Sequence, residues 1–274
     1  MTPRLSSCRM WLPHEGRAVG VDWSGAVQAH RKVWAATLSF RGGQGHLVQL
    51  QRPFSSRGAK AVSEGLGPWL AAQVVDVVGL DFCFSLEASQ LVALGLPVTG
   101  PRELGQAIGE MFTSAESFRA AVGPEKKRVT EVECSAPFAP TNLRMYKQTY
   151  WGLRALGSCR GAFPPWSTSP GPAVVEVLPA EVVRWLGLPK TYKGRGFEER
   201  RREILRRVRE STDLRIPDSD LLTMVSDADG DALDALLAAL SAASAWSSGF
   251  TGAPPTSAST GEGWIFSVRQ RPEQ

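Results

Sequence analysis

The sequence predicts a single α/β domain with a mixed sheet and helices on both faces of the sheet. First, the 274 residues are 43% apolar and only 21% charged, which suffices for one sizeable core and is unlike a disordered chain. Second, short apolar runs of strand length alternate with longer stretches of helical spacing. Third, two of the apolar runs end directly in an aspartate, Asp22 and Asp81, as strands that lead into a functional edge do.

One domain accounts for the whole chain. The long low-complexity stretch SSGFTGAPPTSASTGEG lies too near the C-terminus to separate two domains. We interpret residues 17–268 as the domain, with a surface loop at 247–262. Residues 1–16 are expected to be a flexible N-terminus and residues 269–274 a tail.

Three strands are expected at the beginning of the domain. Ala18–Val21 is a short apolar run that ends in the turn-forming segment Asp22–Gly25. Lys32–Phe40 and Gly45–Gln51 follow at hairpin distance, with Arg41, Gly42 and Gly43 at the turn. These runs predict three antiparallel strands.

Two further strands complete a predicted five-stranded sheet. Val74–Leu80 follows an amphipathic stretch at Ala59–Ala72 and ends in Asp81. Ala173–Val177 is equally apolar except for Glu176. Gly263–Val268 remains open as an additional edge strand.

Helices are expected in the remaining segments. Arg102–Val122 and Leu143–Leu156 predict a helical insertion between the last two strands. Phe197–Glu210 is a charged helix whose arginines have glutamates at i,i+4, so we interpret it as solvated, with a nucleic-acid-binding face as the alternative. Asp229–Trp246 is strongly amphipathic, and Asp227 and Asp229 are interpreted as caps of this helix.

Several classes of protein are excluded by composition. The four cysteines form no C-x-x-C pair and the three histidines all lie in the first fifth of the chain, so neither a disulfide framework nor a zinc site is indicated. Any metal must bind through oxygen. No apolar run approaches the roughly 20 residues that cross a bilayer, so we expect a cytoplasmic protein without a membrane partner.

Four aspartates form the predicted site. Asp22 and Asp81 follow buried strands, while Asp231 and Asp234 are three residues apart in a helix and therefore lie within about 60° around its axis. Clustered carboxylates repel one another unless a cation neutralises them, and Mg²⁺ or Mn²⁺ is the usual cation for oxygen ligands. Two such ions about 4 Å apart can hydrolyse a phosphodiester. The cluster therefore points to nuclease chemistry.

Glu176 is a further candidate because it interrupts an apolar strand. A buried carboxylate needs a partner or a metal. Glu176 is therefore predicted to be a metal ligand or proton carrier, with a structural ion pair to an arginine as the alternative.

Six segments of the chain resemble successive blocks of the DUF429 family, whose members are described as predicted ribonuclease H-like nucleases. The likeness covers roughly residues 17–268, and its segments are GVDWSGA, GLDFCFSL, SAPFAPTNLRMYKQTYWG, VVEVLPAEVVRWLGLPKTYKG, DADGDALDALLAAL and EGWIF. DALDALLAAL is also similar to the final helix of RuvC Holliday-junction resolvases, in which the two matching aspartates bind metal. Asp81 matches the acid of the fourth strand less closely, because other members of the ribonuclease H-like superfamily have a glutamate at that position.

The resemblance implies a ribonuclease H-like fold and a nuclease that uses Mg²⁺ or Mn²⁺ to hydrolyse DNA or RNA. Asp22 would bridge the ions, Asp81, Asp231 and Asp234 would complete their shells, and Glu176 would assist. Three basic residues within the matching blocks are candidates for phosphate binding, with ordinary solvated surface as the alternative: Arg144, Lys147 and Lys193.

Two other functions remain as alternatives. The segment Asp22–Gly25 resembles the first phosphate loop of sugar kinases and actin-like ATPases, which would make Ser24 a substrate contact, but no second phosphate loop is found. The other alternative is a catalytically inactive fold that binds a partner. The sequence predicts no oligomeric state.

Overall fold

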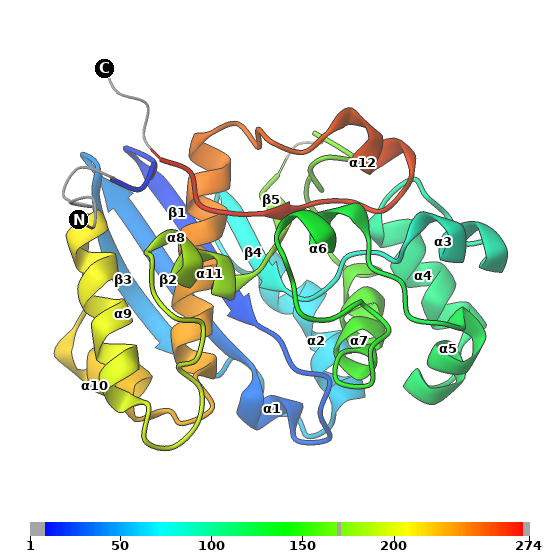
Figure 1. The fold of residues 1–274 in the computed structure, drawn as a ribbon, viewed down its shortest axis with the longest axis horizontal. Helices are drawn as coiled ribbons and strands as arrows, with labels where there is room; N and C mark the ends of the chain where they lie inside the picture. The colour runs from blue at the N-terminus through cyan, green and yellow to red at the C-terminus, as the bar shows by residue number, and fades with distance from the viewer. Residues whose placement is uncertain (1–8, 169–170, 271–274) are drawn as a thin grey trace.

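The computed structural model describes residues 9–168 and 171–270, and a seven-stranded sheet forms its centre (Figure 1). The strand order is β6-β3-β2-β1-β4-β5-β7. Of these strands, β2 alone runs against the others. The strands are β1 (Gly16–Asp22), β2 (Trp34–Arg41), β3 (Gln44–Gln51), β4 (Val77–Asp81), β5 (Ala173–Val177), β6 (Leu214–Arg215) and β7 (Ile265–Phe266).

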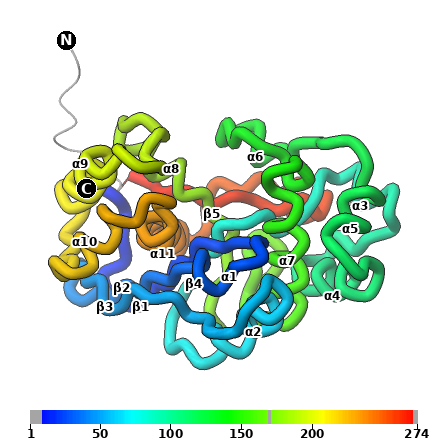
Figure 2. Tube along the Cα trace, turned by 90° about the horizontal axis from the view of Figure 1, so that it is seen from below, coloured from blue at the N-terminus to red at the C-terminus, as the bar shows by residue number. Residues whose placement is uncertain are grey.

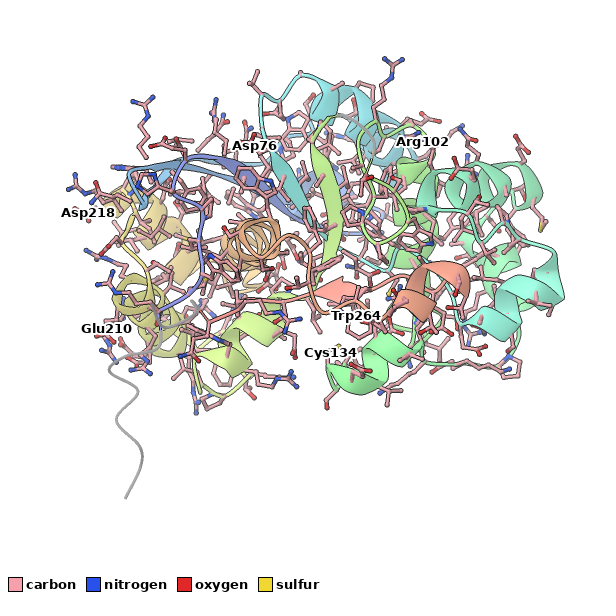
Figure 3. All side chains as sticks on the ribbon, turned by 90° about the horizontal axis from the view of Figure 1, so that it is seen from above. Asp76, Arg102, Cys134, Glu210, Asp218 and Trp264 are labelled. Atoms are coloured by element: carbon pink, nitrogen blue, oxygen red, sulfur yellow. The ribbon has the colours of Figure 1, made fainter. Side chains whose placement is uncertain are left out.

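The expected mixed α/β architecture is confirmed, but the expected count of five strands is wrong. The five predicted strands are present as β1 to β5, and β7 lies within the segment that remained open as an edge strand. β6 was not predicted. Both additional strands are two residues long and lie at the edges of the sheet, so neither has enough residues for an alternating pattern. Figure 3 shows Trp264 directly before β7 at one of these edges.

Helices flank the sheet, and five of them lie between β4 and β5 where an insertion was expected. The predicted helix Arg102–Val122 is two helices, because Ser114 starts a new one with a capping box to Ser117. The helices are α1 (Ala29–Lys32), α2 (Ala59–Ala71), α3 (Ala88–Leu94), α4 (Pro101–Met111), α5 (Ala115–Val122), α6 (Val129–Glu133), α7 (Tyr146–Leu156), α8 (Pro179–Trp185), α9 (Glu198–Ser211), α10 (Asp218–Ser226), α11 (Asp231–Ser247) and α12 (Pro255–Ser259).

The two faces of the sheet bury separate cores. Alternate residues of β1 point to opposite faces, so Val19 and Val21 belong to a core with α2, α4, α5 and α7. Ala18 belongs to a core with α8, α9, α10 and α11. Figure 2 shows α2 and α11 on opposite sides of β1. The sheet is thus covered on both faces.

Helix α11 lies directly on the centre of the sheet and is buried along most of its length. Fourteen of its 17 residues are buried, and Figure 3 looks along this helix, enclosed by side chains. It rests on Gly20 of β1 and Gly79 of β4, which are register partners. A Cβ atom at Gly20 would lie 2.0 Å from the backbone nitrogen of Ala239, and one at Gly79 would lie 2.6 Å from the carbonyl oxygen of Ala238. The two glycines therefore allow a close helix–sheet contact.

The segments at the ends of the chain pack against the domain where the structure describes them. Residues 1–8 of the predicted flexible N-terminus and residues 271–274 of the predicted tail lie outside the described residues. Met10 donates its backbone N–H to Ser211, and Trp11 donates to Arg269. The predicted surface loop at 247–262 contains α12 and the buried side chain of Glu262. Among the described residues, no helix combines the length and apolar character that a bilayer crossing requires.

Candidate active site

Three of the four predicted aspartates meet at the carboxyl ends of the central strands. Asp22 and Asp81 are the last residues of β1 and β4 and are register partners in adjacent parallel strands. Asp234 lies one turn into α11, and carboxylate oxygens of these three residues lie within 4.8 Å of one another. Asp231 is the first residue of α11, and all four aspartates line one cleft of about 700 Å³.

The glycines beneath α11 explain why these side chains meet. Gly20 and Gly79 precede Asp22 and Asp81 by two residues, so each glycine points to the same face as its aspartate. The helix rests on the glycines and its first turn lies over the aspartates. A larger side chain at either glycine would move Asp234 away.

The four carboxylates differ in their partners. Tyr192 donates its hydroxyl to Asp234 Oδ1 at 2.5 Å, and Lys193 Nζ lies 2.5 Å from Asp234 Oδ2 and 3.9 Å from Asp231 Oδ1. Asp22 is only 6% exposed, yet no described residue forms a hydrogen bond or an ion pair with its carboxylate or with that of Asp81. One half of the cluster is therefore paired and the other half is unpaired.

Burial and the repulsion between neighbouring carboxylates raise the pKa values of Asp22, Asp81 and Asp231. Burial has the largest effect on Asp22, and the nearby Asp234, Asp231 and Asp81 carboxylates raise its pKa further, against the opposing effect of Lys193. Burial and Asp234 raise the pKa of Asp81 to about 8, and burial raises that of Asp231 to about 6. For Lys193, burial lowers the pKa, but Asp234 and Asp22 outweigh it and the net shift is upward. Lys193 alone thus does not offset the burial of Asp22, Asp81 and Asp231.

The family model of DUF429, described as a protein of unknown function, matches residues 20–258. The chain belongs to the DUF429 family. The matched range of this DUF429 chain includes β1 from Gly20 onward and all four aspartates of the cleft. No curated protein and no solved structure matches the chain.

The raised pKa values predict that the metal-free DUF429 chain loses stability as the pH rises. An acid with a raised folded-state pKa holds its proton more tightly when folded, so its stabilising effect is present in acid and lost at higher pH. For Asp81 the window runs from its ordinary value of 3.8 to about 8. The melting temperature measured in EDTA should therefore decrease as the pH rises from about 5 to about 8. Asp81→Asn should flatten this dependence, and an equally steep fall in that variant would contradict the assignment.

Arg201 holds the loop that carries Tyr192 and Lys193. Its side chain is fully buried, and its guanidinium donates to the carbonyl oxygens of Tyr192 at 2.6 Å, Gly194 at 3.1 Å and Val225 at 2.8 Å. The interpretation of the α9 arginines as solvated is therefore wrong for this residue. Arg201 positions Lys193 next to the aspartates without contacting them.

Arg201→Ala is expected to destabilise the protein by about 3 kcal/mol, because three buried carbonyl groups lose a charged donor. Arg202→Ala is the matched control, since Arg202 is exposed on the same helix and, among the described residues, pairs only with Glu199. We expect this control to cost less than about 1 kcal/mol. Urea denaturation compares the two variants, and equal midpoints would refute the positioning role.

Of the residues predicted to contact phosphate, some line the cleft and others lie outside it. Ser24 lines the cleft beside Asp22, and its hydroxyl accepts a hydrogen bond from Ala26 N–H at 3.3 Å. Arg144 and Lys147 do not line the cleft. The Arg144 guanidinium lies over the Phe138 ring, and Lys147 Nζ lies 3.0 Å from a carboxylate oxygen of Glu116. Lys193 is thus the one predicted basic residue that the structure brings to the aspartates.

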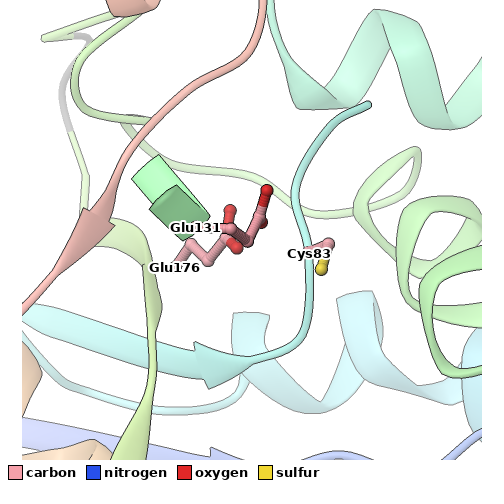
Figure 4. Close-up of side chains that lie close together, drawn as sticks. All are labelled: Cys83, Glu131 and Glu176. Atoms are coloured by element: carbon pink, nitrogen blue, oxygen red, sulfur yellow. The ribbon is translucent and has the colours of Figure 1, made fainter. Parts of the chain in front are cut away.

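Glu176 has the arginine partner that the sequence left as an alternative. Arg128 is completely buried and donates to Glu176 Oε2 at 2.8 Å, and Phe84 donates its backbone N–H to the same oxygen. Figure 4 shows Glu176 beside Glu131 and Cys83, but Arg128 binds both glutamates. Glu176 also lines the cleft next to Asp81, so the pair with Arg128 forms a charged wall behind the site.

Some residues around the cleft were missed or misinterpreted. Asp227 caps α11 by accepting a hydrogen bond from Ala232 N–H, as predicted, whereas Asp229 forms an ion pair with Lys32 instead of a cap. Gln148 donates to the carbonyl oxygen of Asp81 at 2.7 Å and was not predicted. Arg128 was missed as well, and its local partner is Glu131, whose carboxylate accepts hydrogen bonds from the Arg128 backbone N–H and guanidinium.

Proposed function

We propose that this chain is a ribonuclease H-like nuclease that hydrolyses phosphodiester bonds of DNA or RNA with Mg²⁺ or Mn²⁺. The convergence of Asp22, Asp81 and Asp234 within 4.8 Å carries this proposal. The mixed sheet with acids at the ends of its first and fourth strands and on its last long helix supports the ribonuclease H-like part.

The donor set fits a hard divalent cation. It consists of carboxylate oxygens, which Mg²⁺ and Mn²⁺ prefer, and the buried carboxylate of Asp22 has no partner among the described residues. Asp22 and Asp81 would hold the ion first, and Asp234 and Asp231 would complete the set as Lys193 yields its contacts. When bound, such an ion polarises a phosphoryl oxygen and activates water.

The protein's own residues perform the remaining tasks. Lys193 Nζ lies at the aspartates and offers a positive charge to the phosphate, which the carboxylates alone would repel. Arg201 keeps that lysine in place through the backbone on either side of it. Tyr192 donates to Asp234 and so orients this carboxylate toward Asp22 and Asp81.

Nucleotide binding of the actin-like ATPase or kinase type is the second candidate. Ser24 and Asp22 line the same cleft, and a cleft of about 700 Å³ is large enough for a nucleotide. The nuclease proposal is preferred because the acidic residues outnumber the groups that would hold a triphosphate.

Cleavage assays test the proposal. Labelled DNA and RNA of single-stranded, duplex and branched structure are incubated with the protein in Mn²⁺, Mg²⁺ or EDTA, and ATP hydrolysis is measured in parallel. We expect cleavage that requires the metal, and a higher melting temperature in Mn²⁺, worth about 2.7 kcal/mol at 100 times Kd. ATP hydrolysis without cleavage would favour the second candidate. If Mn²⁺ does not change the melting temperature and no cleavage is detected, the chain would be a catalytically inactive binding module.

A further inference from the structure

The cleft has two chemically different ends. The aspartates and Lys193 form the end at β1 and β4. The other end lies at the carboxyl end of β5 and has apolar side chains beside Glu176 and Lys190. These apolar side chains come from the loop after α6 and from the junction of β5 and α8, among them Phe138, Val177, Leu178 and Pro179.

The spacing of the strands sets the distance between these ends. Asp22 ends β1, Asp81 ends β4, and Leu178 directly follows β5, the next strand along the sheet. Adjacent strands are separated by about 4.8 Å, so β5 lies about 10 Å from β1 and about 5 Å from β4 along the sheet edge. The spacing from β1 to β5 is of the order of the distance from the phosphate of one nucleotide to the far side of its base.

Phe138 gives the apolar end an aromatic surface. It is half-buried and lines the cleft, and the Arg144 guanidinium lies 5.3 Å from its ring centroid. Aromatic side chains with a neighbouring arginine are the usual platforms on which unpaired bases stack. Every base has a flat apolar face, so such a platform recognises a nucleotide without reading its sequence.

The size of the cleft separates an unpaired nucleotide from a base pair. Its volume of about 700 Å³ lies within the range of small-molecule pockets, roughly 300 to 1,000 Å³. A cleft of this size accommodates one nucleotide, so a base that enters it fully would have to leave its partner. A duplex would have to release the nucleotide first, at a cost of a few kcal/mol.

Arg144 favours a polynucleotide over a free nucleotide. It is exposed beside Phe138, outside the cleft lining, and no carboxylate of the described residues pairs with it. A strand that continues past a base stacked on Phe138 would bring its next phosphate toward this guanidinium. A free nucleotide has no second phosphodiester for it to bind.

We propose that the cleft binds one unpaired nucleotide of a single strand, with its phosphate at the aspartates and Lys193 and its base on Phe138. The substrate class is thus single-stranded nucleic acid or a frayed strand end. This inference rests on the proposed nuclease function for the phosphate end, while the apolar end stands on the cavity and on Phe138.

Binding measurements test the inference separately from cleavage. Fluorescence anisotropy in Ca²⁺ compares a labelled single-stranded oligonucleotide with a blunt duplex of the same sequence, and unlabelled nucleoside monophosphate serves as competitor. We expect the single strand to bind at least about 10-fold more tightly than the duplex, and the monophosphate to compete only at much higher concentration.

Variants of Phe138 identify the platform. Phe138→Ala and Phe138→Leu should each weaken single-strand binding about 10-fold, since leucine fills the space but offers no aromatic face, and Phe138→Trp should retain binding. Val132→Ala is the control, because Val132 is exposed on α6 and outside the cleft lining. Circular dichroism confirms that the variants fold.

The outcomes distinguish the two proposals. Equal binding of duplex and single strand, or full binding by Phe138→Leu, overturns the unpaired-nucleotide site even when cleavage is observed. Competition by the monophosphate at the affinity of the oligonucleotide overturns the strand assignment in favour of a free nucleotide. Binding of the single strand through Phe138 without any cleavage supports this site and refutes only the nuclease proposal.

Discussion

Asp22→Asn is expected to reduce metal-dependent cleavage at least about 100-fold and to raise the melting temperature of the metal-free protein. The amide keeps the shape of the side chain but cannot supply the charge that holds a divalent ion. It also removes a buried carboxylate whose pKa is raised by burial and by three neighbouring aspartates. At pH 8 we expect a gain of about 2–4 °C, the shift that roughly 1 kcal/mol produces in a chain of this size.

Thermal melts with and without Mn²⁺ provide the measurement, together with the cleavage assay. The stabilisation by Mn²⁺ should vanish in Asp22→Asn and persist in Asp218→Asn, which removes an exposed aspartate at the start of α10. An Asp22→Asn protein that Mn²⁺ still stabilises as strongly as the wild type would place the metal elsewhere.

Gly20→Val is expected to cost about 3 kcal/mol or more and to remove the response to Mn²⁺ in the protein that still folds. The atoms closest to a new Cβ are backbone atoms of Ala239 and Ala235, at 2.0 and 2.2 Å, so relief requires movement of the whole helix. That movement carries Asp234 away from Asp22 and Asp81.

Gly109→Ala is the matched control for this substitution. Gly109 lies in α4 and the nearest atom to its Cβ position is 4.0 Å away, so alanine should be neutral or stabilise by up to about 1 kcal/mol. Urea denaturation of both variants measures the two changes in the free energy of unfolding. A Gly20→Ala protein with wild-type stability would show that α11 does not lie against the sheet as closely as the structure places it.

The aspartate cluster could be predicted because its determinants are local. An apolar run that ends in an aspartate marks Asp22 and Asp81 wherever the strands lie, and the spacing of Asp231 and Asp234 follows from helix geometry alone. Their convergence followed from the rule that parallel strands end at one edge of a sheet. That rule accounts for Asp22 and Asp81, whereas Asp234 joins them because α11 rests on Gly20 and Gly79.

The ion pairs around the cluster were harder to predict, because they depend on which face of an element is buried. Arg201 lies in a run of arginines that looks solvated, yet Arg201, Ile204, Leu205 and Val208 follow the i, i+3, i+4, i+7 spacing of a buried stripe. That pattern was present in the sequence and was masked by the surrounding charges. Arg128 and Glu176 are 48 residues apart, and no sequence pattern links positions at such a distance.

The position of α11 has a consequence for how the molecule is made. The helix fills the centre of one core and supplies Asp234, but it follows Asp22 by more than 200 residues in the chain. Domains are synthesised from the N-terminus, so β1 and β4 leave the ribosome long before the helix that covers them. A nascent chain that ends before Asp231 has neither the covered sheet nor the assembled carboxylates. Packing of this face of the sheet and convergence of the aspartates are therefore expected to occur together, late in translation.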